Sequence, residues 1–275
     1  AMAEAVILKS LTLKNPFIAS SGTCGYADVD FIPLDKFGAV VTKTITIKPR
    51  AGNKPPRLVE TPAGLLNSIG LQNMGLKAFK TFLAKFKKPT TLIVSVGGES
   101  PEEFATILRE LSTYDLIDAF ELNLSCPNVK TGGEVVGKDY AAVSNILEAS
   151  LNSSKKPLLV KLSPFTEQLE EVLDHWESKV EAFVLFNTFP AMDIDTQSGK
   201  PILGAISGGL SGPAVYPIVL NSVYKYSKAH TLVASGGIVS ANIAKKFLLA
   251  GAKALEVGTG NLWNPLFIET LIKEV

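Results

Sequence analysis

Eight short apolar runs, separated by stretches of helical length, constrain the fold of this chain more than any other feature. Several runs are apolar on both alternating faces, which is typical of parallel strands that are buried on both sides. The runs span residues 16–20, 38–43, 91–96, 119–123, 157–162, 182–187, 231–235 and 254–258. Between them, Ser100 and Pro101 begin one predicted helix, and 166–179 and 240–250 have a similar pattern. Strands and helices are therefore predicted to alternate.

Eight such units with right-handed crossovers predict a single (β/α)8 TIM barrel over residues 1–275. An open doubly wound sheet has phosphate-binding glycines after its first strand, whereas residues 21–25 here lack the GxGxxG spacing. Two long segments interrupt the alternation, 44–74 after the second strand and 188–213 after the sixth. Because the loops that follow barrel strands form the catalytic face, we expect both inserts at the active site.

Charge and cysteine content exclude several classes of function. The 27 basic and 26 acidic side chains give a net charge of +1 without a basic stripe, so no nucleic acid partner is expected. No apolar run approaches the roughly 18 to 20 residues of a membrane span, and the first residues lack a signal-peptide pattern. We therefore expect a cytoplasmic protein with no membrane association. The two cysteines form no CxxC pair, so no metal site is expected within the chain.

Polar residues follow most of the predicted strands. Lys43 and Lys161 each end an apolar run, and both ammonium groups are expected in the barrel mouth, where they would offset the charge of an anion or a reduced cofactor. For either lysine alone, the alternative is a side chain that extends to the surface. Glycine turns at 235–237 and 257–259 follow the last two strands, where barrels commonly bind phosphate. Ordinary turn chemistry is the alternative there.

Cys126 follows the fourth predicted strand and lies between Asn123 and Asn128. An inert buried thiol is the alternative for a lone cysteine, but the proline that follows places this one in a loop at the mouth. His175 and His230 are expected at the surface, which excludes Ser-His and Cys-His catalysis. The acids of the inserts lack the spacing of a two-carboxylate hydrolase. A thiol base, two cations, several amides and a phosphate site together predict proton abstraction coupled to a redox cofactor.

Long ordered motifs in this chain resemble the class 1 dihydroorotate dehydrogenases. They cover 42–44, 49–57, 60–73, 123–129, 160–164, 187–188, 208–213 and 258–259, and the resemblance extends from about residue 6 to residue 266. The stretches ETPAGLLNSIGLQN (60–73) and SCPNVKTGG (125–133) resemble the type B subclass more than the homodimeric type A. The resemblance implies an FMN-containing barrel that oxidises (S)-dihydroorotate to orotate in de novo pyrimidine (UMP) biosynthesis.

The resemblance also implies roles for individual residues. Cys126 would be the general base that takes a proton from C5 of dihydroorotate while a hydride leaves C6 for flavin N5. The substrate would be surrounded by Lys43, Asn67, Ser68, Ile69, Gly70, Leu71, Asn123, Asn128, Asn187 and Thr188. FMN would be held by Ser21, Lys43, Thr44, Asn123, Lys161, the backbone at Phe186, Gly212, Gly236, Gly237, Gly258 and Thr259. Ser95 stands where the family usually has asparagine, which would alter one flavin contact.

The type B resemblance further implies a partner. An FAD and [2Fe–2S] subunit would pass electrons to NAD⁺ in a heterotetramer, and a homodimer of the FMN chain is expected. The residues leave two other functions open. One is a related FMN barrel that acts on dihydropyrimidines, in the manner of dihydropyrimidine dehydrogenase. The other is a non-catalytic barrel subunit that binds a nucleotide and stabilises a partner.

Overall fold

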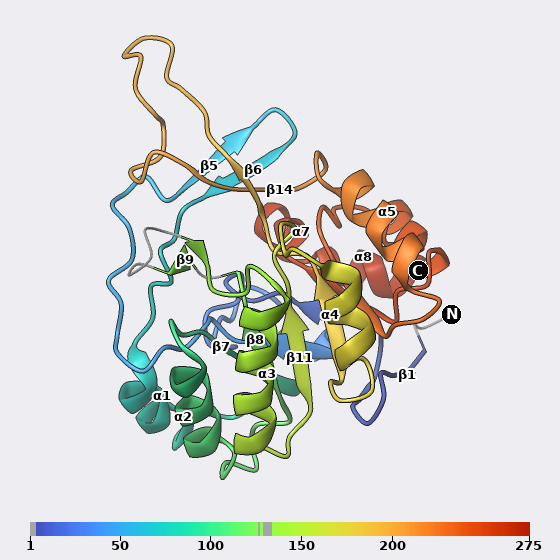
Figure 1. Cartoon of the computed structure of the whole chain (residues 1–275). Helices are drawn as coiled ribbons and strands as arrows, with labels where there is room; N and C mark the ends of the chain where they lie inside the picture. Colours follow the sequence, from blue (N-terminus) through green and yellow to red (C-terminus); the bar gives the residue numbers. More distant parts are fainter. Residues whose placement is uncertain (1–3, 126, 129–133) are drawn as a thin grey trace.

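The computed structural model describes residues 4–125, 127–128 and 134–275 and contains a closed barrel of eight parallel strands (Figure 1). The strands are β3 (Phe17–Ala19), β4 (Ala39–Val41), β7 (Thr91–Val96), β8 (Ala119–Asn123), β11 (Leu158–Lys161), β12 (Ala182–Leu185), β15 (Leu232–Ser235) and β16 (Ala254–Val257). Their order around the barrel follows the chain, and β16 closes onto β3. Each strand lies within one predicted run, so the TIM barrel prediction is confirmed.

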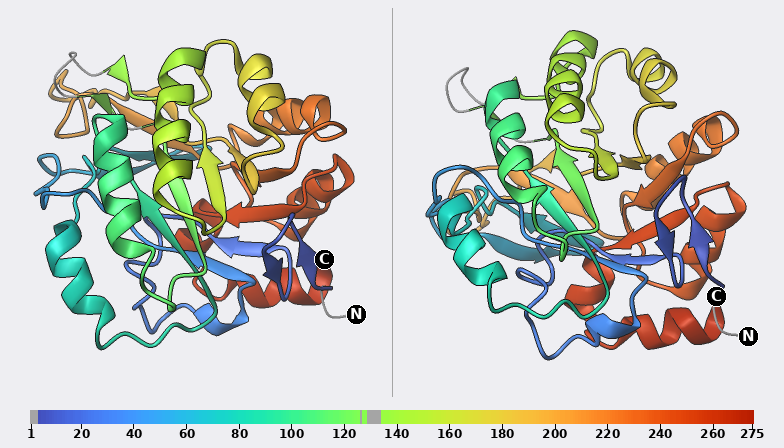
Figure 2. Two further views of the ribbon diagram at one scale, coloured as in Figure 1. Left: turned by 60° about the horizontal axis from the view of Figure 1, so that its bottom comes forward. Right: turned by 90° about the horizontal axis from the view of Figure 1, so that it is seen from below.

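Helices alternate with these strands and cover the outside of the barrel (Figure 2). They are α1 (Gly75–Leu83), α2 (Pro101–Leu111), α3 (Tyr140–Ser153), α4 (Leu169–Trp176), α5 (Tyr216–Tyr226), α6 (Ala241–Leu249), α7 (Thr259–Trp263) and α8 (Phe267–Glu274), with a 3-10 turn η1 (Leu34–Lys36). Ser100 and Ser240 cap α2 and α6 by accepting hydrogen bonds from backbone N–H groups in the first turn. Among the residues described, none of the helices has the length and apolar character that crossing a bilayer requires.

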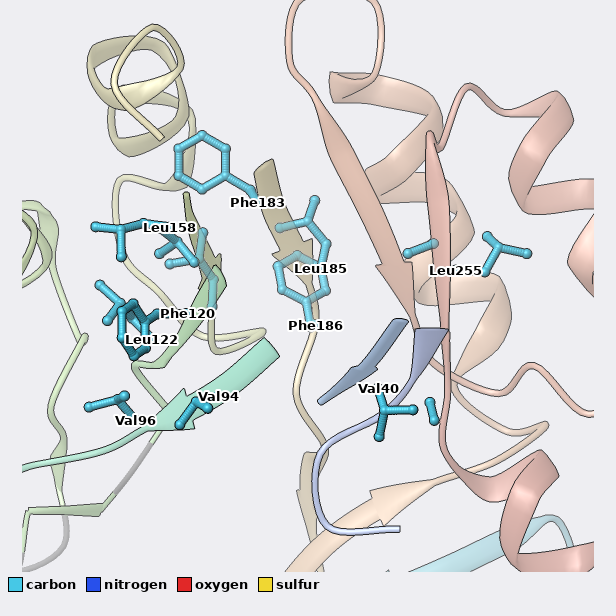
Figure 3. Packing of buried hydrophobic residues seen from close by; sticks show 14 of the residues in the cluster. Val40, Val94, Val96, Phe120, Leu122, Leu158, Phe183, Leu185, Phe186 and Leu255 are labelled. Carbon is cyan, nitrogen blue, oxygen red and sulfur yellow. The ribbon is translucent and has the colours of Figure 1, made fainter. Parts of the chain in front are cut away.

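Apolar side chains fill both sides of the barrel wall. Alternate strand residues such as Val94, Phe120 and Phe183 pack outward against the helices (Figure 3). The residues between them form a second cluster, which draws on all eight strands and therefore lies inside the barrel. A short hairpin of β1 (Val6–Ile7) and β2 (Thr12–Leu13) adds Leu8, Leu11 and Leu13 to this inner cluster. The hairpin therefore closes the amino-terminal end of the barrel.

The segments that follow β4 and β12 pair with each other. The first contains β5 (Leu58–Thr61) and β6 (Gly64–Asn67), and the second contains β13 (Phe189–Ala191) and β14 (Gly208–Ser211). Together they form one antiparallel sheet in the order β13-β14-β6-β5. In Figure 1, β5, β6 and β14 lie above the carboxyl end of β11, on the side where the catalytic face of a barrel is expected. β9 (Pro127–Asn128) pairs antiparallel with β10 (Glu134–Val135).

The two histidines differ in environment. His175 is exposed, as predicted, but His230 is buried, so its predicted surface position is wrong. His230 Nε2 lies 2.8 Å from Asp174 Oδ1, and its Nδ1 lies 2.9 Å from the Tyr226 carbonyl oxygen. Because it precedes β15, His230 lies at the amino-terminal end of the barrel, opposite the predicted mouth. Its polar partners explain how an imidazole is buried there without a catalytic role.

Candidate active site

The lining of the barrel changes from apolar to polar within one layer of side chains. Residues of the inner apolar cluster are followed, two positions later on the same face of their strands, by hydroxyl or charged groups. These groups, all buried, are Ser20, Ser95, Glu121, Lys161, Ser235 and Glu256. Barrel interiors are usually filled by branched apolar residues, and burying polar groups costs free energy. A buried polar layer at the carboxyl end therefore indicates the floor of a functional site.

Lys161 lies at the centre of this polar layer. Its Nζ is 2.5 Å from Glu256 Oε2 and donates to Ser20 Oγ at 3.2 Å, while Glu121 Oε1 lies 3.9 Å away. Burial opposes the charge on Lys161, but the two carboxyl groups outweigh it and raise the pKa of this lysine. Lys161 is therefore a cation held within the barrel and does not extend to the surface.

Lys43 is the second cation at the mouth, and it is half-buried. Burial and the nearby Arg57 guanidinium lower the pKa of Lys43. Within the part of the chain that the structure describes, no carboxylate lies at salt-bridge distance from Lys43. Arg57 donates to the carbonyls of Asn53 and Ala51 and to Gln72 Oε1, so it braces the insert after β4. Two neighbouring cations of this kind would favour binding of an anion.

A chain of hydrogen bonds joins the ends of four strands. Thr44 Oγ1 lies 2.9 Å from Ser95 Oγ and accepts from Asn123 Nδ2 at 3.2 Å. Asn123 Oδ1 in turn accepts from Asn187 Nδ2 at 3.4 Å. Ser95 is fully buried and contributes to holding Thr44. The structure thus brings Thr44, Asn123 and Asn187 together, as the sequence predicts.

The predicted substrate loop follows β6 and is held by the insert itself. Ser68 N donates to the Arg57 carbonyl at 2.7 Å, and Asn53 Nδ2 donates to Ser68 Oγ at 2.8 Å. Gly70 has φ of +72°, and a side chain there would approach the Asn53 backbone nitrogen to 2.6 Å. Residues 67–71 lie at the end of β6, next to β14, because Asn67 of β6 pairs with Gly209 of β14. Thr188 touches the same strand, since a Cβ on Gly209 would lie 1.9 Å from Thr188 Oγ1.

The predicted phosphate-binding glycines also meet in space. Gly237 has φ of +71°, and a Cβ there would lie 2.5 Å from the carbonyl oxygen of Gly212. Gly212 has φ of +98° and is equally crowded, because a Cβ would lie 2.7 Å from Gly64 Cα. Thr259 Oγ1 donates to Ser211 Oγ at 3.0 Å, which ties the turn after β16 to the same place. Backbones that approach this closely require glycine, as in many phosphate sites.

The remaining predicted site residues are placed as follows. Ser21 Oγ donates to the Thr42 carbonyl at 2.8 Å, and Phe186 N donates to the Ser235 carbonyl at 3.0 Å. Gly236 lies between Ser235 and Gly237 in the chain. A Cβ added to Gly258 would lie 3.7 Å from Ser20 Cβ. Asn128 belongs to β9. Cys126 lies outside the described residues. Ile69 and Leu71 belong to the loop described above, with Leu71 at φ of +53°.

Sequence reasoning missed Glu121 and Glu256. Both lie inside strands that otherwise read as apolar, Ala-Phe-Glu-Leu-Asn and Ala-Leu-Glu-Val. A carboxylate in the middle of a buried parallel strand is the signal that would have found them, because such a group is rarely buried unless it is paired. Two surface hollows lie elsewhere, one between α1 and α2 and one below α3, and their linings hold none of the predicted site residues.

Comparison with known proteins gives a consistent result. The family model described as dihydroorotate dehydrogenase matches residues 4–275. A Pelobacter propionicus protein named dihydroorotate dehydrogenase B (NAD(+)), catalytic subunit, is 44% identical over 269 residues, which cover 94% of this chain and 88% of that protein. A Desulforudis audaxviator protein of the same name is 42% identical over 270 residues, covering 95% and 87%.

Solved structures agree on the fold. The Eimeria tenella DHODH in complex with ferulenol has a TM-score of 0.80 at 22% identity and covers 98% of this chain and 82% of its own. The ligand-free form from the same organism also has a TM-score of 0.80, at 23% identity. At this identity the likeness concerns the barrel alone, while the curated relatives and the family match concern the sequence of nearly the whole chain. The chain belongs to the dihydroorotate dehydrogenase family, whose members are oxidoreductases.

Proposed function

We propose that this chain, as a single domain of residues 1–275, oxidises (S)-dihydroorotate to orotate with bound FMN as the hydride acceptor. Its family establishes the coarser statement, which is that the enzyme oxidises dihydroorotate in pyrimidine biosynthesis. The observation that supports FMN chemistry most directly is the buried polar layer around Lys161, in a position where barrels usually bury apolar side chains. A fixed cation beneath a flavin would stabilise the negative charge that reduction adds.

The residues present fit an FMN molecule. Gly212, Gly236, Gly237, Gly258 and Thr259 would hold its phosphate, because the turns they form meet where a single Cβ would fill the space. Ser21, Lys43, Thr44, Asn123, Lys161 and the backbone at Phe186 would surround its ring system. Bound FMN would accept the hydride from the substrate. The protein's part is to position the two molecules and to set the local charge.

The substrate side of the site would be formed by the two inserts. Lys43, reinforced by Arg57, would bind the carboxylate of dihydroorotate. The amides of Asn67, Asn123, Asn128 and Asn187, with Thr188 and the loop 68–71, would match the donors and acceptors of the cyclic diamide. These carboxamides cannot act as bases near neutral pH.

Cys126 is the proposed general base. It follows directly on Ser125, whose backbone N–H donates to Asn123 Oδ1 at 3.3 Å, so its chain position is next to the amide network of the mouth. A thiolate there would take the proton from C5 of dihydroorotate while the hydride leaves C6. No histidine is available for this step, because His230 lies at the opposite end of the barrel and His175 is exposed on α4.

We further propose that the chain works in the cytoplasm with a second subunit. The relatives named above are called catalytic subunits and carry NAD(+) in their names. A [2Fe–2S] cluster needs four ligands, usually thiolates, and this chain has two cysteines. An FAD and [2Fe–2S] subunit would therefore carry electrons to NAD⁺, with a homodimer of this chain at the centre of a heterotetramer.

The test is anaerobic turnover of the purified yellow protein with an artificial electron acceptor. Dihydroorotate should be oxidised and dihydrouracil should not. Lys43→Met should raise KM for dihydroorotate by about 10- to 100-fold, because a charge-assisted hydrogen bond of about 1.5–3 kcal/mol is lost. Lys48→Met, an exposed lysine in the same insert, is the matched control and should leave KM unchanged.

Two results would contradict the proposal. Preference for dihydrouracil would assign the chain to the dihydropyrimidine class, in which the substrate has no carboxylate to bind. A colourless protein that takes up no FMN and oxidises neither substrate would favour a non-catalytic barrel subunit.

A further inference from the structure

Two buried glutamates beneath the mouth have no part in the reaction proposed above. Glu121 is 0% exposed and Glu256 is 1% exposed. Within the described part of the chain, both oxygens of Glu121 and Oε1 of Glu256 have no hydrogen-bond partner. Burying a carboxyl group without hydrogen-bond partners costs on the order of several kcal/mol. A purely structural role therefore explains poorly why two such groups lie side by side.

The two carboxyl groups differ in how they meet Lys161. Glu256 Oε2 lies 2.5 Å from Lys161 Nζ and also accepts from Ser20 Oγ at 3.1 Å. Glu121 Oε1 lies 3.9 Å from the same nitrogen and accepts from no donor. One cation cannot compensate two buried anions. The carboxyl group with donors therefore stays ionised, and the one without them keeps its proton.

The titration of the pair has the same direction. Burial, and next the neighbouring Glu256, raise the pKa of Glu121 well above its ordinary value. For Glu256 burial acts in the same upward direction, but Lys161 and the hydrogen bonds outweigh it and lower the pKa. A proton on one Glu121 oxygen can be donated to Glu256 Oε1, which gives partners to two of the three unpartnered oxygens. The floor of the site is thus a cation, an anion and a neutral acid, with no net charge.

We propose that Glu256 is a positioning residue that tunes the bound flavin through Lys161. The inference rests on the proposed function, in which FMN lies over this lysine. The Glu256 carboxylate offsets the charge of Lys161, so the site stabilises the negative charge of the reduced flavin less than Lys161 alone would. The chain therefore holds its flavin at a lower reduction potential, which favours passing the electrons on.

The experiment compares reduction potentials of the FMN-loaded protein, measured anaerobically against reference dyes. In the Glu121→Gln background, where Glu121 cannot ionise in its place, Glu256→Gln removes the negative charge and should favour the reduced over the oxidised flavin by at least tenfold, a rise of about 30 mV for a two-electron couple. Glu121→Gln is the matched control. Glutamine replaces an acid that is already neutral and can donate to Glu256 in its place, so the potential should stay at the wild-type value.

A third variant tests the same charge with a smaller structural change, in case the glutamine variant does not fold. Glu256→Asp keeps a counter-charge for Lys161 but withdraws it by one methylene group, so it should fold and should shift the potential in the same direction by a smaller amount. Equal potentials in wild type, Glu256→Asp and the double variant, or a rise in Glu121→Gln alone as large as in the double variant, would overturn the inference. Failure of the wild type to take up FMN would instead overturn the proposed function, so the two failures are distinct.

Discussion

At the scale of single residues, the two cysteines differ in their place in the chain and in the role proposed for them. Cys24 is fully buried in the outer apolar cluster, and burial raises its pKa to about 11. Near neutral pH, Cys24 is therefore a thiol and cannot serve as a base. Cys126 remains the predicted base on the evidence of its motif and its place after Asn123.

Replacing each cysteine separates these roles. Cys126→Ala should keep bound FMN but lose about 10² to 10⁴-fold in turnover near neutral pH, which is the usual contribution of a general base. Cys126→Ser should move the pH profile of turnover to higher pH, because a hydroxyl is a weaker acid than a thiol with a pKa of about 8.5. Cys24→Ala is the control and should leave the pH profile in place. Near-normal rates in Cys126→Ala would contradict the assignment.

The position of a residue in the site could be predicted where it depends only on the neighbouring sequence. Lys161 follows an apolar run, so its position at the mouth is readable from the sequence. Its partners are not, because Glu121 and Glu256 are 135 positions apart in the sequence and meet only when the barrel closes. The same holds for Ser95, whose contact with Thr44 joins neighbouring strands.

At the scale of elements, the barrel strands were predictable and the pairing of the inserts was not. A parallel strand buried on both faces is a continuous apolar run, which eight stretches of this chain show. β5, β6, β13 and β14 lie in segments rich in glycine, proline and polar residues, and each gains its hydrogen bonds from a strand contributed by a distant part of the chain or by its own hairpin. The hairpin of β1 and β2 was missed because both strands have only two residues.

The close approach of two glycine turns can be tested in one substitution. Gly237→Ala should weaken FMN binding by tenfold or more, because the added methyl would lie 2.5 Å from the Gly212 carbonyl and push the two turns apart. Gly199→Ala is the matched control, since Gly199 has a similar φ of +69° with nothing within 4 Å. Titration of the apoprotein with FMN by fluorescence measures both. Equal FMN affinities in the two variants would contradict the proposal that the close contact between the two turns is needed for FMN binding.

The hairpin that closes the barrel depends on Glu181. This carboxylate accepts from the backbone N–H groups of Lys9, Ser10 and Leu11 at 2.7 to 2.9 Å and from Ser10 Oγ. Burial opposes its charge, but these hydrogen bonds outweigh burial and lower the pKa of Glu181 below its ordinary value. A depressed folded-state pKa contributes stability above the unfolded pKa, and this is lost as the pH falls through the folded pKa.

Glu181→Gln should therefore reduce the free energy of unfolding by about 1.5–3 kcal/mol at neutral pH, the range for hydrogen bonds to a charged group. The difference from wild type should shrink below about pH 4.5, where the carboxylate of the unfolded chain becomes protonated. Glu170→Gln is the control, because Glu170 forms an exposed ion pair with Lys225 that is worth about 1 kcal/mol or less. Urea unfolding at several pH values measures both, and a pH-independent difference would contradict the proposed role of the charge.

At the scale of the whole molecule, the barrel supplies a floor with no net charge and a covering sheet, and the reaction needs an exit for electrons. The chain has neither the thiolates for an iron–sulfur cluster nor a GxGxxG turn after its first strand for a dinucleotide. Loaded with FMN, the isolated protein should oxidise dihydroorotate with an artificial acceptor but form NADH only at background rate. Adding the proposed FAD and [2Fe–2S] subunit should restore NADH formation without changing the dye-coupled rate, because all residues of the proposed site belong to this chain. Rapid NADH formation by the isolated protein would show that electrons leave the flavin directly, and the second subunit would then have no role in this step.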